Sequence, residues 1–199
     1  MNILHTIGYL NLSSGGPVES LKQISNYQVQ KGHNVTILHT FQDIDGTRPK
    51  FNKNVKIISL KSYTKFRFSS VLFKNTIIEN FKPDVIHAHG IWRFINVVSY
   101  LASSKLKIPF VISPCGMLQE NALKIARWQK LILWNLIFKN CLENSSQIIV
   151  KSDSELLQLK KYVRKKNTTI IPNTIEIPLS IKKFKKENQI VYILSLIHI

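Results

Sequence analysis

The segment PDVIHAHGIW, residues 83–92, is a short apolar run that reaches a glycine and is followed by a second apolar run. Residues 84–89 have the length of a strand and are apolar on both faces, as in a buried parallel sheet. Residues 91–104 are apolar almost all round, which suits a helix packed on a sheet. The segment therefore predicts a strand, a tight loop and a helix, the unit from which parallel sheets are built.

The same unit recurs along the rest of the chain. Apolar, β-branched runs of strand length lie at residues 2–7, 34–39, 55–60, 109–113, 147–150 and 168–171. Segments of helical length separate them, at residues 17–31, 118–142 and 152–162. This alternation predicts an α/β fold class: a Rossmann-like, doubly wound parallel sheet flanked by helices.

Three of the predicted helices carry clear sequence signals. Pro17 at a first-turn position and Gly32 after the last turn bound the first helix, and Ser152 with Glu155 forms a capping-box pattern. The segment 118–142 is predicted to be one long amphipathic helix. Its polar side carries Asn121, Lys124, Arg127 and Lys130, and its apolar side carries Ile125, Trp128, Ile132 and Leu136.

Charge is the outlying feature of the composition. The chain has 199 residues, 44% of them hydrophobic, which is enough for a globular core. Its 28 Lys and Arg residues against 11 Asp and Glu residues give a net charge of +17. This excess favours anionic partners such as nucleic acid, anionic lipid or phosphorylated substrates, or it reflects solubility and a Lys, Asn and Ile bias of AT-rich coding.

Cysteine usage and apolar runs bear on the compartment. The chain has only Cys115 and Cys141, without CxxC spacing, so neither a disulfide framework nor a zinc site is expected. No apolar run reaches the roughly 18 residues that span a bilayer, and the N-terminus lacks the features of a secretory signal. A cytoplasmic protein is expected.

The character of the chain changes after Pro172. Residues 178–188 contain a basic run next to proline breaks and are predicted to be a linker. Residues 189–199 then resume as a strand with almost no chain left to pair with. We expect a first domain over residues 1–177 and, in residues 189–199, the first strand of a truncated second domain.

Loops that follow the strands are the candidate binding sites, because ligands of open α/β sheets lie outside the carboxyl ends of the strands. After the first strand, Gly15 and Gly16 precede a predicted helix start. Glycines let the backbone come close to a ligand, and the N–H groups of a helix start suit a phosphate. An ordinary tight turn is the alternative, since the stretch matches neither dinucleotide nor P-loop patterns.

His87 and His89 lie at strand spacing, on one face of the predicted strand. No acidic or cysteine partner lies nearby in the sequence, so metal ligation is not expected. His87 is predicted to be a hydrogen-bonded core residue, and His89, at the strand end, is the better candidate to contact a substrate as a donor or proton handler. Cys115 is expected to be a small buried side chain, not a nucleophile.

The stretch KSYTKFRF, residues 61–68, interleaves Lys61, Lys65 and Arg67 with three aromatic residues. One interpretation is a solvated loop whose aromatics cover the core. The other is a surface that meets an anionic membrane.

Together these loops resemble the N-terminal domain of GT-B fold glycosyltransferases of family 4. The motifs are SSGGP after the first strand, PDVIHAHGIW, PFVISPCGML followed by ALKIARWQKLILWNLIF, SDSE after a strand, and IIPNTIEIP at the end of the domain. The resemblance implies a retaining enzyme that uses a nucleotide sugar and requires no metal or other cofactor. The family commonly has His or Arg where this chain has Cys115.

The resemblance also implies roles for individual residues. Gly15 and Gly16 would approach the donor diphosphate. The loops after the fourth and fifth strands would face the cleft, with His89 as the catalytic candidate and Gly90, Trp92, Cys115 and Gly116 as acceptor-binding residues.

The function expected from the resemblance is transfer of a sugar to a lipid-linked or saccharide acceptor in surface polysaccharide or lipopolysaccharide assembly, at the inner face of the plasma membrane. The 199-residue chain alone is expected to be inactive. An enzymatic alternative is a nucleotide-sugar 2-epimerase of the same fold. A non-enzymatic alternative is a basic Rossmann-like module for nucleic acid, although the basic residues are dispersed and no nucleic-acid-binding motif accompanies them.

Overall fold

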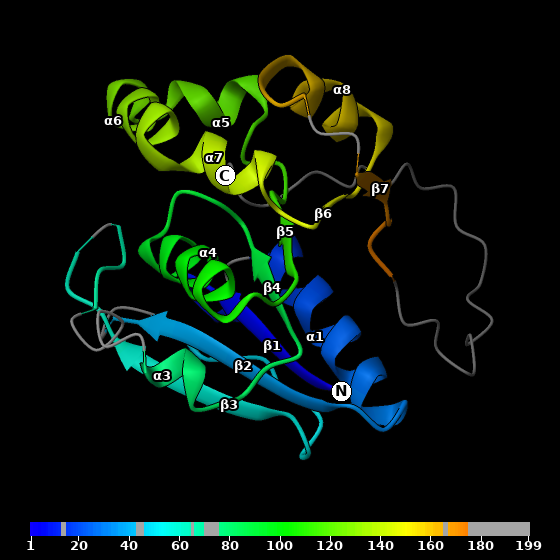
Figure 1. The fold of residues 1–199 in the computed structure, drawn as a ribbon. Helices are drawn as coiled ribbons and strands as arrows, with labels where there is room; N and C mark the ends of the chain where they lie inside the picture. Colours follow the sequence, from blue (N-terminus) through cyan, green and yellow to red (C-terminus); the bar gives the residue numbers. More distant parts are fainter. Residues whose placement is uncertain (13–14, 43–45, 65, 70–75, 165–166, 175–199) are drawn as a thin grey trace, which may run out of the picture.

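Seven parallel strands form a single sheet in the order β3-β2-β1-β4-β5-β6-β7 (Figure 1). The computed structural model describes residues 1–12, 15–42, 46–64, 66–69, 76–164 and 167–174. The strands are β1 (Asn2–Ile7), β2 (Asn34–Phe41), β3 (Lys56–Lys61), β4 (Val85–His89), β5 (Phe110–Ser113), β6 (Gln147–Val150) and β7 (Thr168–Ile170). The chain builds outward from β1 in both directions, which confirms the predicted doubly wound, Rossmann-like sheet.

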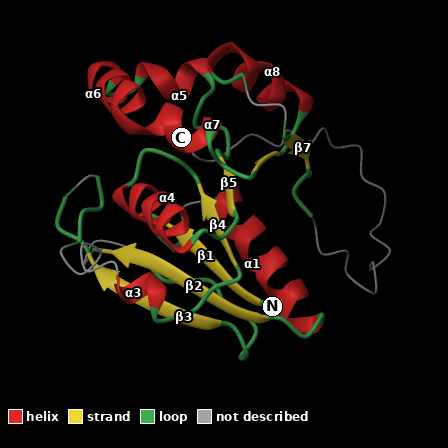
Figure 2. Ribbon diagram, viewed as in Figure 1, coloured by secondary structure: helices red, strands yellow, loops and turns green. Residues whose placement is uncertain are grey.

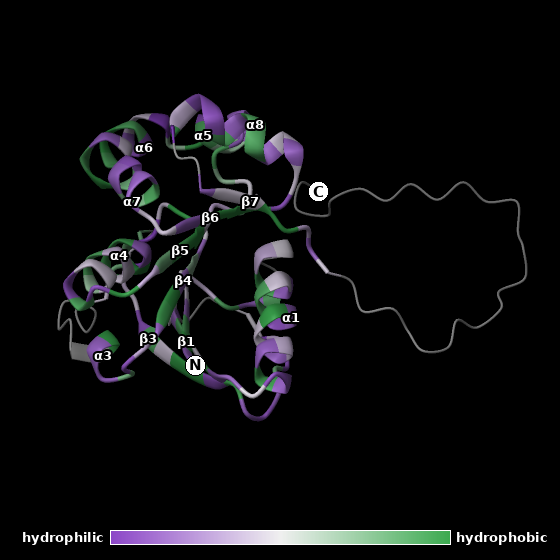
Figure 3. Ribbon diagram, turned by 45° about the vertical axis from the view of Figure 1, so that its right-hand side comes forward, coloured by the Kyte–Doolittle hydropathy of each residue, from purple (hydrophilic) through white to green (hydrophobic). Residues whose placement is uncertain are grey.

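Helices cover both faces of this sheet. Helix α1 (Gly16–Gln30) lies on one face, and α3 (Thr76–Glu79) and α4 (Phe94–Leu106) lie on the other (Figures 2 and 3). The remaining helices gather near the β5, β6 and β7 end of the sheet (Figure 1). They are α5 (Glu120–Lys124), α6 (Arg127–Leu133), the π-helix η2 (Trp134–Phe138), α7 (Lys139–Glu143) and α8 (Asp153–Tyr162).

The sheet separates two apolar clusters. On the α4 side, Leu4 of β1 and Ile86 and Ala88 of β4 are fully buried in the larger cluster. On the α1 side, Ile37 of β2 packs with Leu21 in the smaller one. Neighbouring side chains of a strand point to opposite faces of the sheet. In β1 and β4 the even-numbered apolar residues therefore join the larger cluster, and the odd-numbered residues face α1.

The predicted helix over residues 118–142 is interrupted once, at Ile125 and Ala126, and contains a π-helical turn, and its predicted apolar side faces outward. Ile125 is extended and Ala126 is left-handed, with φ 53, so the helix restarts at Arg127. The π-helix η2 then adds a residue to one turn. Leu118, Phe138 and Leu142 reach the core, whereas the side that the sequence pattern marks as apolar is exposed.

Other sequence signals agree with the structure. Helix α8 begins at Ser152, whose Oγ accepts a hydrogen bond from the Glu155 N–H at 3.2 Å. The predicted domain end near residue 177, the linker over 178–188 and the strand over 189–199 lie outside the described residues. None of the described helices combines the length and the apolar character that crossing a bilayer requires.

Truncating a core side chain of β4 tests this arrangement. Ile86 is fully buried, so Ile86→Ala is expected to lower the free energy of unfolding by about 2–5 kcal/mol in urea denaturation. Leu157 of α8 is 65% exposed, so the matched change Leu157→Ala is expected to stay within about 0.5 kcal/mol. Equal effects of the two changes would contradict a central position for β4.

Candidate functional site at the carboxyl edge of the sheet

The loops after β4 and β5 meet at the carboxyl edge of the sheet in strained conformations. Trp92 has φ 67 and Cys115 has φ 54, both in the left-handed region that non-glycine residues rarely adopt. Gly90 and Gly116 also have positive φ, at 79 and 76. Strain of this kind persists only where the surrounding structure holds it, and it concentrates at functional sites.

Hydrogen bonds join these two loops into one unit. The Gly90 N–H donates to the Ser113 carbonyl at 2.7 Å, and the Trp92 Nε1–H donates to the Met117 carbonyl at 3.1 Å. A Cβ added at Gly90 would lie 2.9 Å from Met117 Cε, so a side chain there would have to displace the end of the Met117 side chain. Backbone and side-chain contacts thus tie the loops after β4 and β5 to each other.

A buried carboxylate ties the same unit to β6. One oxygen of Glu155 accepts the Gly116 N–H at 2.6 Å, and the other accepts the Lys151 N–H at 2.7 Å. Glu155 is 4% exposed, and its side chain bridges two loops instead of returning to the N-cap residue as in a complete capping box. Hydrogen bonds between a carboxylate and backbone N–H groups are strong, so Glu155 acts as a clamp.

A cavity of about 840 Å³ opens beside this unit, between the loops after β3, β4 and β5 and the helix α6. Its walls include Arg67, Arg93 and Lys130 together with Phe66 and Trp92. A Cβ added at Gly8 would lie 2.6 Å from Arg93 Cγ, so only glycine after β1 leaves room for this arginine.

The cationic side chains of the cavity pack on aromatic rings. The guanidinium groups of Arg67 and Arg93 lie 5.6 and 5.4 Å from the ring centre of Tyr9, and Lys130 Nζ lies 5.7 Å from that of Trp92. Partial burial, and next the charge of Arg93, lower the pKa of Lys130. A bound anion would offset both effects, so the cavity is suited to a negatively charged ligand.

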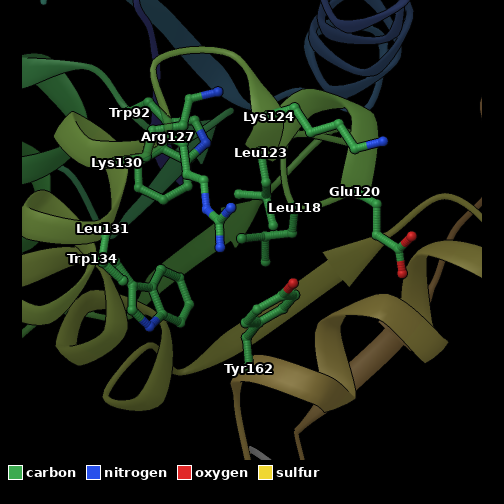
Figure 4. Close-up of a pocket in the computed structure, with 10 residues that line it drawn as sticks. All are labelled: Trp92, Leu118, Glu120, Leu123, Lys124, Arg127, Lys130, Leu131, Trp134 and Tyr162. Atoms are coloured by element: carbon green, nitrogen blue, oxygen red, sulfur yellow. The ribbon is translucent and has the colours of Figure 1, made fainter.

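A second cavity, of about 400 Å³, shares Trp92 and Lys130 with the first (Figure 4). The rings of Trp134 and Tyr162 are 5.9 Å apart, and Figure 4 shows the Arg127 side chain extending toward the space between them. Aromatic surfaces beside a guanidinium suit a ring-shaped ligand with a polar or anionic substituent.

Three histidines form a buried chain on the face that α1 covers. His5 Nδ1 lies 3.0 Å from His89 Nε2, and His5 Nε2 lies 2.7 Å from Gln28 Oε1. His87 Nε2 lies 2.8 Å from Ser113 Oγ. His89 is thus at the strand end as predicted, but it is 3% exposed and faces away from the side on which Trp92 lines the cavities.

Burial sets the protonation of this histidine chain. It lowers the pKa of His5 to about 4, partly countered by the Gln28 hydrogen bond. Burial, followed by the charges of the other histidines and Lys151, holds the pKa values of His87 and His89 well below 6.5. All three imidazoles are therefore neutral at neutral pH.

The same three residues have the spacing of a metal site, because ligand nitrogens of His5, His87 and His89 all lie within 4.8 Å of one another. His5, which the sequence analysis did not include, supplies the third nitrogen. Both nitrogens of His5 and Nε2 of His87 already have hydrogen-bond partners, and His89 Nδ1 is buried without one. The set fits a chain of neutral imidazoles better than an open metal centre.

The remaining predicted site residues lie at separate points of the edge. Gly15 is the N-cap of α1, with φ 67 and ψ −140, and Gly16 lies beside Asn173. Cys115 donates a weak hydrogen bond to the Ser113 carbonyl, and burial raises the pKa of its thiol to about 11, so the thiol form predominates at neutral pH.

The basic and aromatic stretch after β3 divides between core and cavity. Phe66 packs against the larger core cluster, with its ring centre 5.9 Å from that of Phe94. Arg67 lines the larger cavity, and Lys61 ends β3 as an exposed side chain. Lys65 lies outside the described residues. Phe66 therefore covers the core, as in the first of the two interpretations, whereas Tyr63 is 68% exposed and the membrane interpretation stays a prediction.

Several residues of this edge were not singled out from the sequence: Gly8, Tyr9, Arg93, Lys130, Tyr162 and the clamp carboxylate of Glu155. For Gly8, Tyr9 and Arg93 the signal was available, since Gly8 and Tyr9 directly follow β1 and Arg93 lies in the loop after β4. Lys130 and Tyr162 come from helices, and Lys130 Nζ lies over the ring of Trp92.

A family model described as Glycosyltransferase Family 4 matches residues 14–177. Sucrose-phosphate synthase from Thermosynechococcus elongatus is similar in structure, with a TM-score of 0.58, 15% identity and coverage of 86% of this chain and 48% of that one. HepE from Anabaena, solved in complex with UDP and glucose, has a TM-score of 0.56 and 15% identity, with coverage of 88% of this chain and 45% of that one. UDP-GlcNAc 2-epimerase from Methanocaldococcus jannaschii has a TM-score of 0.55 and 16% identity, with coverage of 87% of this chain and 46% of that one.

The chain thus spans about half the length of these solved structures. No curated protein matches the sequence. At such low identity the structural similarity establishes the fold, and the family match carries the assignment to a family.

The N-cap of α1 yields a prediction from paired glycines. Gly15 has a φ and ψ that side chains disfavour, so Gly15→Ala is expected to lower the free energy of unfolding by about 1–3 kcal/mol. A Cβ at Gly16 would meet only Asn173 Nδ2, at 3.8 Å, so Gly16→Ala is expected to leave stability unchanged or slightly higher. Chemical denaturation of both variants measures the difference, and a neutral Gly15→Ala would refute the assigned cap geometry.

The histidine chain predicts an acid-sensitive fold. Below about pH 6.5 the unfolded chain binds protons at His5, His87 and His89 while the folded chain resists them. The free energy of unfolding is therefore highest above pH 6.5 and decreases as the pH drops toward 4. Each histidine contributes a decrease of up to about 1.4 kcal/mol per pH unit.

Melting temperatures measured between pH 7.5 and 4.5 test this expectation. His5→Gln is expected to make the fall with pH shallower. His33→Gln changes a histidine that does not belong to the buried group of His5, His87 and His89, and it is the control. This variant is expected to retain the wild-type dependence of the melting temperature on pH. Identical slopes for all three proteins would show that the buried histidines do not cause the acid sensitivity.

Proposed function

The chain belongs to glycosyltransferase family 4, and from this premise we propose that it is the acceptor-side half of a GT-B enzyme. The proposed reaction transfers a sugar, with retention of configuration, from a nucleotide sugar to a saccharide or lipid-linked acceptor. We place it in surface polysaccharide or lipopolysaccharide assembly. The complete active site would lie between this domain and a second Rossmann-like half, because the chain covers about half of each similar structure.

The observation that carries the proposal is the larger cavity at the carboxyl edge, with Arg67, Arg93 and Lys130 in its walls. A volume of about 840 Å³ is in the range of small-molecule sites. Its cations favour an acceptor that carries negative charge, such as a phosphate-linked saccharide. Gly90, Trp92, Cys115 and Gly116 would shape the acceptor side through the strained loops they form.

The donor diphosphate is proposed to approach Gly15 and Gly16. The N-cap conformation of Gly15 brings bare backbone to the edge, and the Gly16 N–H is at the start of a 15-residue helix. Pro17 removes one N–H group from the first turn, so further charge stabilisation would have to come from the second half. In this scheme backbone N–H groups and basic side chains stabilise the departing nucleoside diphosphate without a metal or other cofactor.

For His89 we propose a positioning role in the reaction. Its carbonyl and that of Gly90 are within reach of Asn96 Nδ2, at 3.5 and 3.1 Å, at the start of the strained loop that carries Trp92. A neutral imidazole packed on His5 fixes the strand end from which that loop departs. His89 thereby determines where the acceptor loop begins, without contact between its imidazole and the acceptor.

The proposed membrane partner follows from the kind of acceptor that the enzyme uses. A lipid-linked acceptor would bring the protein to the inner face of a membrane, where Lys61, Lys65 and Arg67 were predicted to meet anionic lipid. Arg67 also lines the larger cavity, so we propose that it contacts the acceptor and that Lys61 contributes surface charge.

The proposal is tested with the chain joined to a C-terminal half from the same family, assayed for transfer of labelled sugar. Lys130→Met removes a cation that lies over Trp92 and is expected to raise KM for a charged acceptor by about tenfold, as for loss of a charge-assisted contact. Lys160→Met, at an exposed lysine of α8, is the control and is expected to leave KM unchanged.

The other outcomes of this assay discriminate between functions. Epimerisation of the nucleotide sugar without transfer would favour the 2-epimerase alternative. Sugar transfer by the 199-residue chain alone would contradict a two-domain active site. Tight binding of single-stranded nucleic acid at physiological salt would favour the nucleic-acid module.

A further inference from the structure

Four large apolar side chains form an exposed ridge that runs from the turn before α6 along α6 to η2. Ile125, Trp128, Ile132 and Leu136 are 71%, 75%, 59% and 74% exposed. The remaining large exposed apolar side chains of the described residues, apart from Leu131 next to the ridge, are scattered over other elements. Isolated exposed apolar residues are normal at protein surfaces, whereas a contiguous group indicates a binding surface.

The ridge belongs to a segment that already contributes other apolar side chains to the core. Leu118, Phe138 and Leu142 are buried there, whereas Trp128, Ile132 and Leu136 are exposed. In the hydropathy colouring, α6 carries hydrophobic residues among hydrophilic ones (Figure 3). The core of the domain is complete without the ridge, so the ridge is available to a partner.

The charges around the ridge identify the kind of partner. Residues 121–142 contain Lys124, Arg127, Lys130 and Lys139 and no Asp or Glu. Lys124, Arg127 and Lys139 are exposed beside the ridge. An apolar stripe with a tryptophan, whose charged neighbours within residues 121–142 are all basic, is the pattern of a helix that lies in the interface of an anionic bilayer.

We propose that the ridge of Ile125, Trp128, Ile132 and Leu136 docks the protein on an anionic lipid bilayer. The apolar side chains enter the boundary between headgroups and acyl chains, and the neighbouring lysines and arginine contact lipid phosphates. A second copy of the chain is disfavoured as the occupant, because two chains of net charge +17 repel each other.

The ridge is continuous with the larger cavity. Ile125 and Ile132 belong to the ridge and also line that cavity, next to Lys130. A lipid-anchored acceptor held in the bilayer would therefore reach the cavity directly from the docked surface. This link to the acceptor rests on the proposed function, whereas binding of the ridge to lipid does not depend on it.

Co-sedimentation with vesicles tests docking without any assay of activity. The 199-residue chain is expected to bind vesicles of phosphatidylglycerol and phosphatidylcholine, to bind phosphatidylcholine alone much less, and to dissociate as salt is raised. Trp128→Ser, Ile132→Ser and Leu136→Ser together are expected to weaken binding by at least about tenfold, since each removes a buried apolar contact with the bilayer.

Two further variants make the test specific. Leu101→Ser with Leu157→Ser removes leucines that are 49% and 65% exposed outside the ridge, and wild-type binding is expected to remain. Lys124→Gln, Arg127→Gln and Lys139→Gln together are expected to abolish the preference for anionic lipid. Melting temperatures verify that each variant is folded.

Three results would overturn the proposal. The first is absence of vesicle binding by the wild-type chain, and the second is equal binding by the ridge variant and the leucine control. The third is self-association that depends on the ridge, measured by sedimentation in the absence of lipid, which would make a second copy the occupant. If vesicle binding holds while the completed enzyme transfers no sugar, the proposed function fails and the docking surface stands.

Discussion

Strand β4 is hydrogen-bonded on both edges and covered on both faces, and the rest of the structure depends on this confinement. It pairs with β1 and β5, its even-numbered side chains enter the core under α4, and its odd-numbered histidines face α1. After the carboxyl end of β4 the backbone changes direction at Gly90 and Trp92, which both have positive φ values. The cavities, the clamp of Glu155 and the break before α6 are all arranged around that exit.

The electrostatic organisation follows the same division of faces. On the α1 side, desolvation keeps three imidazoles neutral, and the charge of Lys151 acts in the same direction on His87 and His89. On the α4 side, guanidinium and ammonium groups are held over the rings of Tyr9 and Trp92 in partly open cavities. The imidazoles are thus uncharged, whereas the cavity side carries a group of cations.

The sequence was sufficient to predict the strands of the sheet, but it did not predict which side chains line the candidate site. Buried parallel strands are apolar throughout, so runs such as residues 84–89 were assigned almost to the residue, and Ser152 and Pro17 marked helix starts through local chemistry. The segment 118–142 was assigned as one helix because no proline or glycine interrupts it, and the left-handed Ala126 leaves no sequence signal. His89 was expected to contact substrate because strand ends do so on average, but the burial of its ring depends on His5, 84 residues away along the chain.

The clamp of Glu155 has a consequence for how this fold diversifies. Its carboxylate fixes the backbone of Gly116, where the excursion that carries α5, α6, η2 and α7 leaves the sheet, and the Ser146 N–H donates to the Phe110 carbonyl at 2.7 Å where the chain re-enters it. The entropy of closing a loop between fixed ends grows only with the logarithm of its length, at about 0.6 kcal/mol for each doubling. Relatives can therefore lengthen, shorten or replace this excursion at little cost to the sheet, and it becomes the part of the domain in which evolution can alter the contacted surface while the strand-end loops stay unchanged.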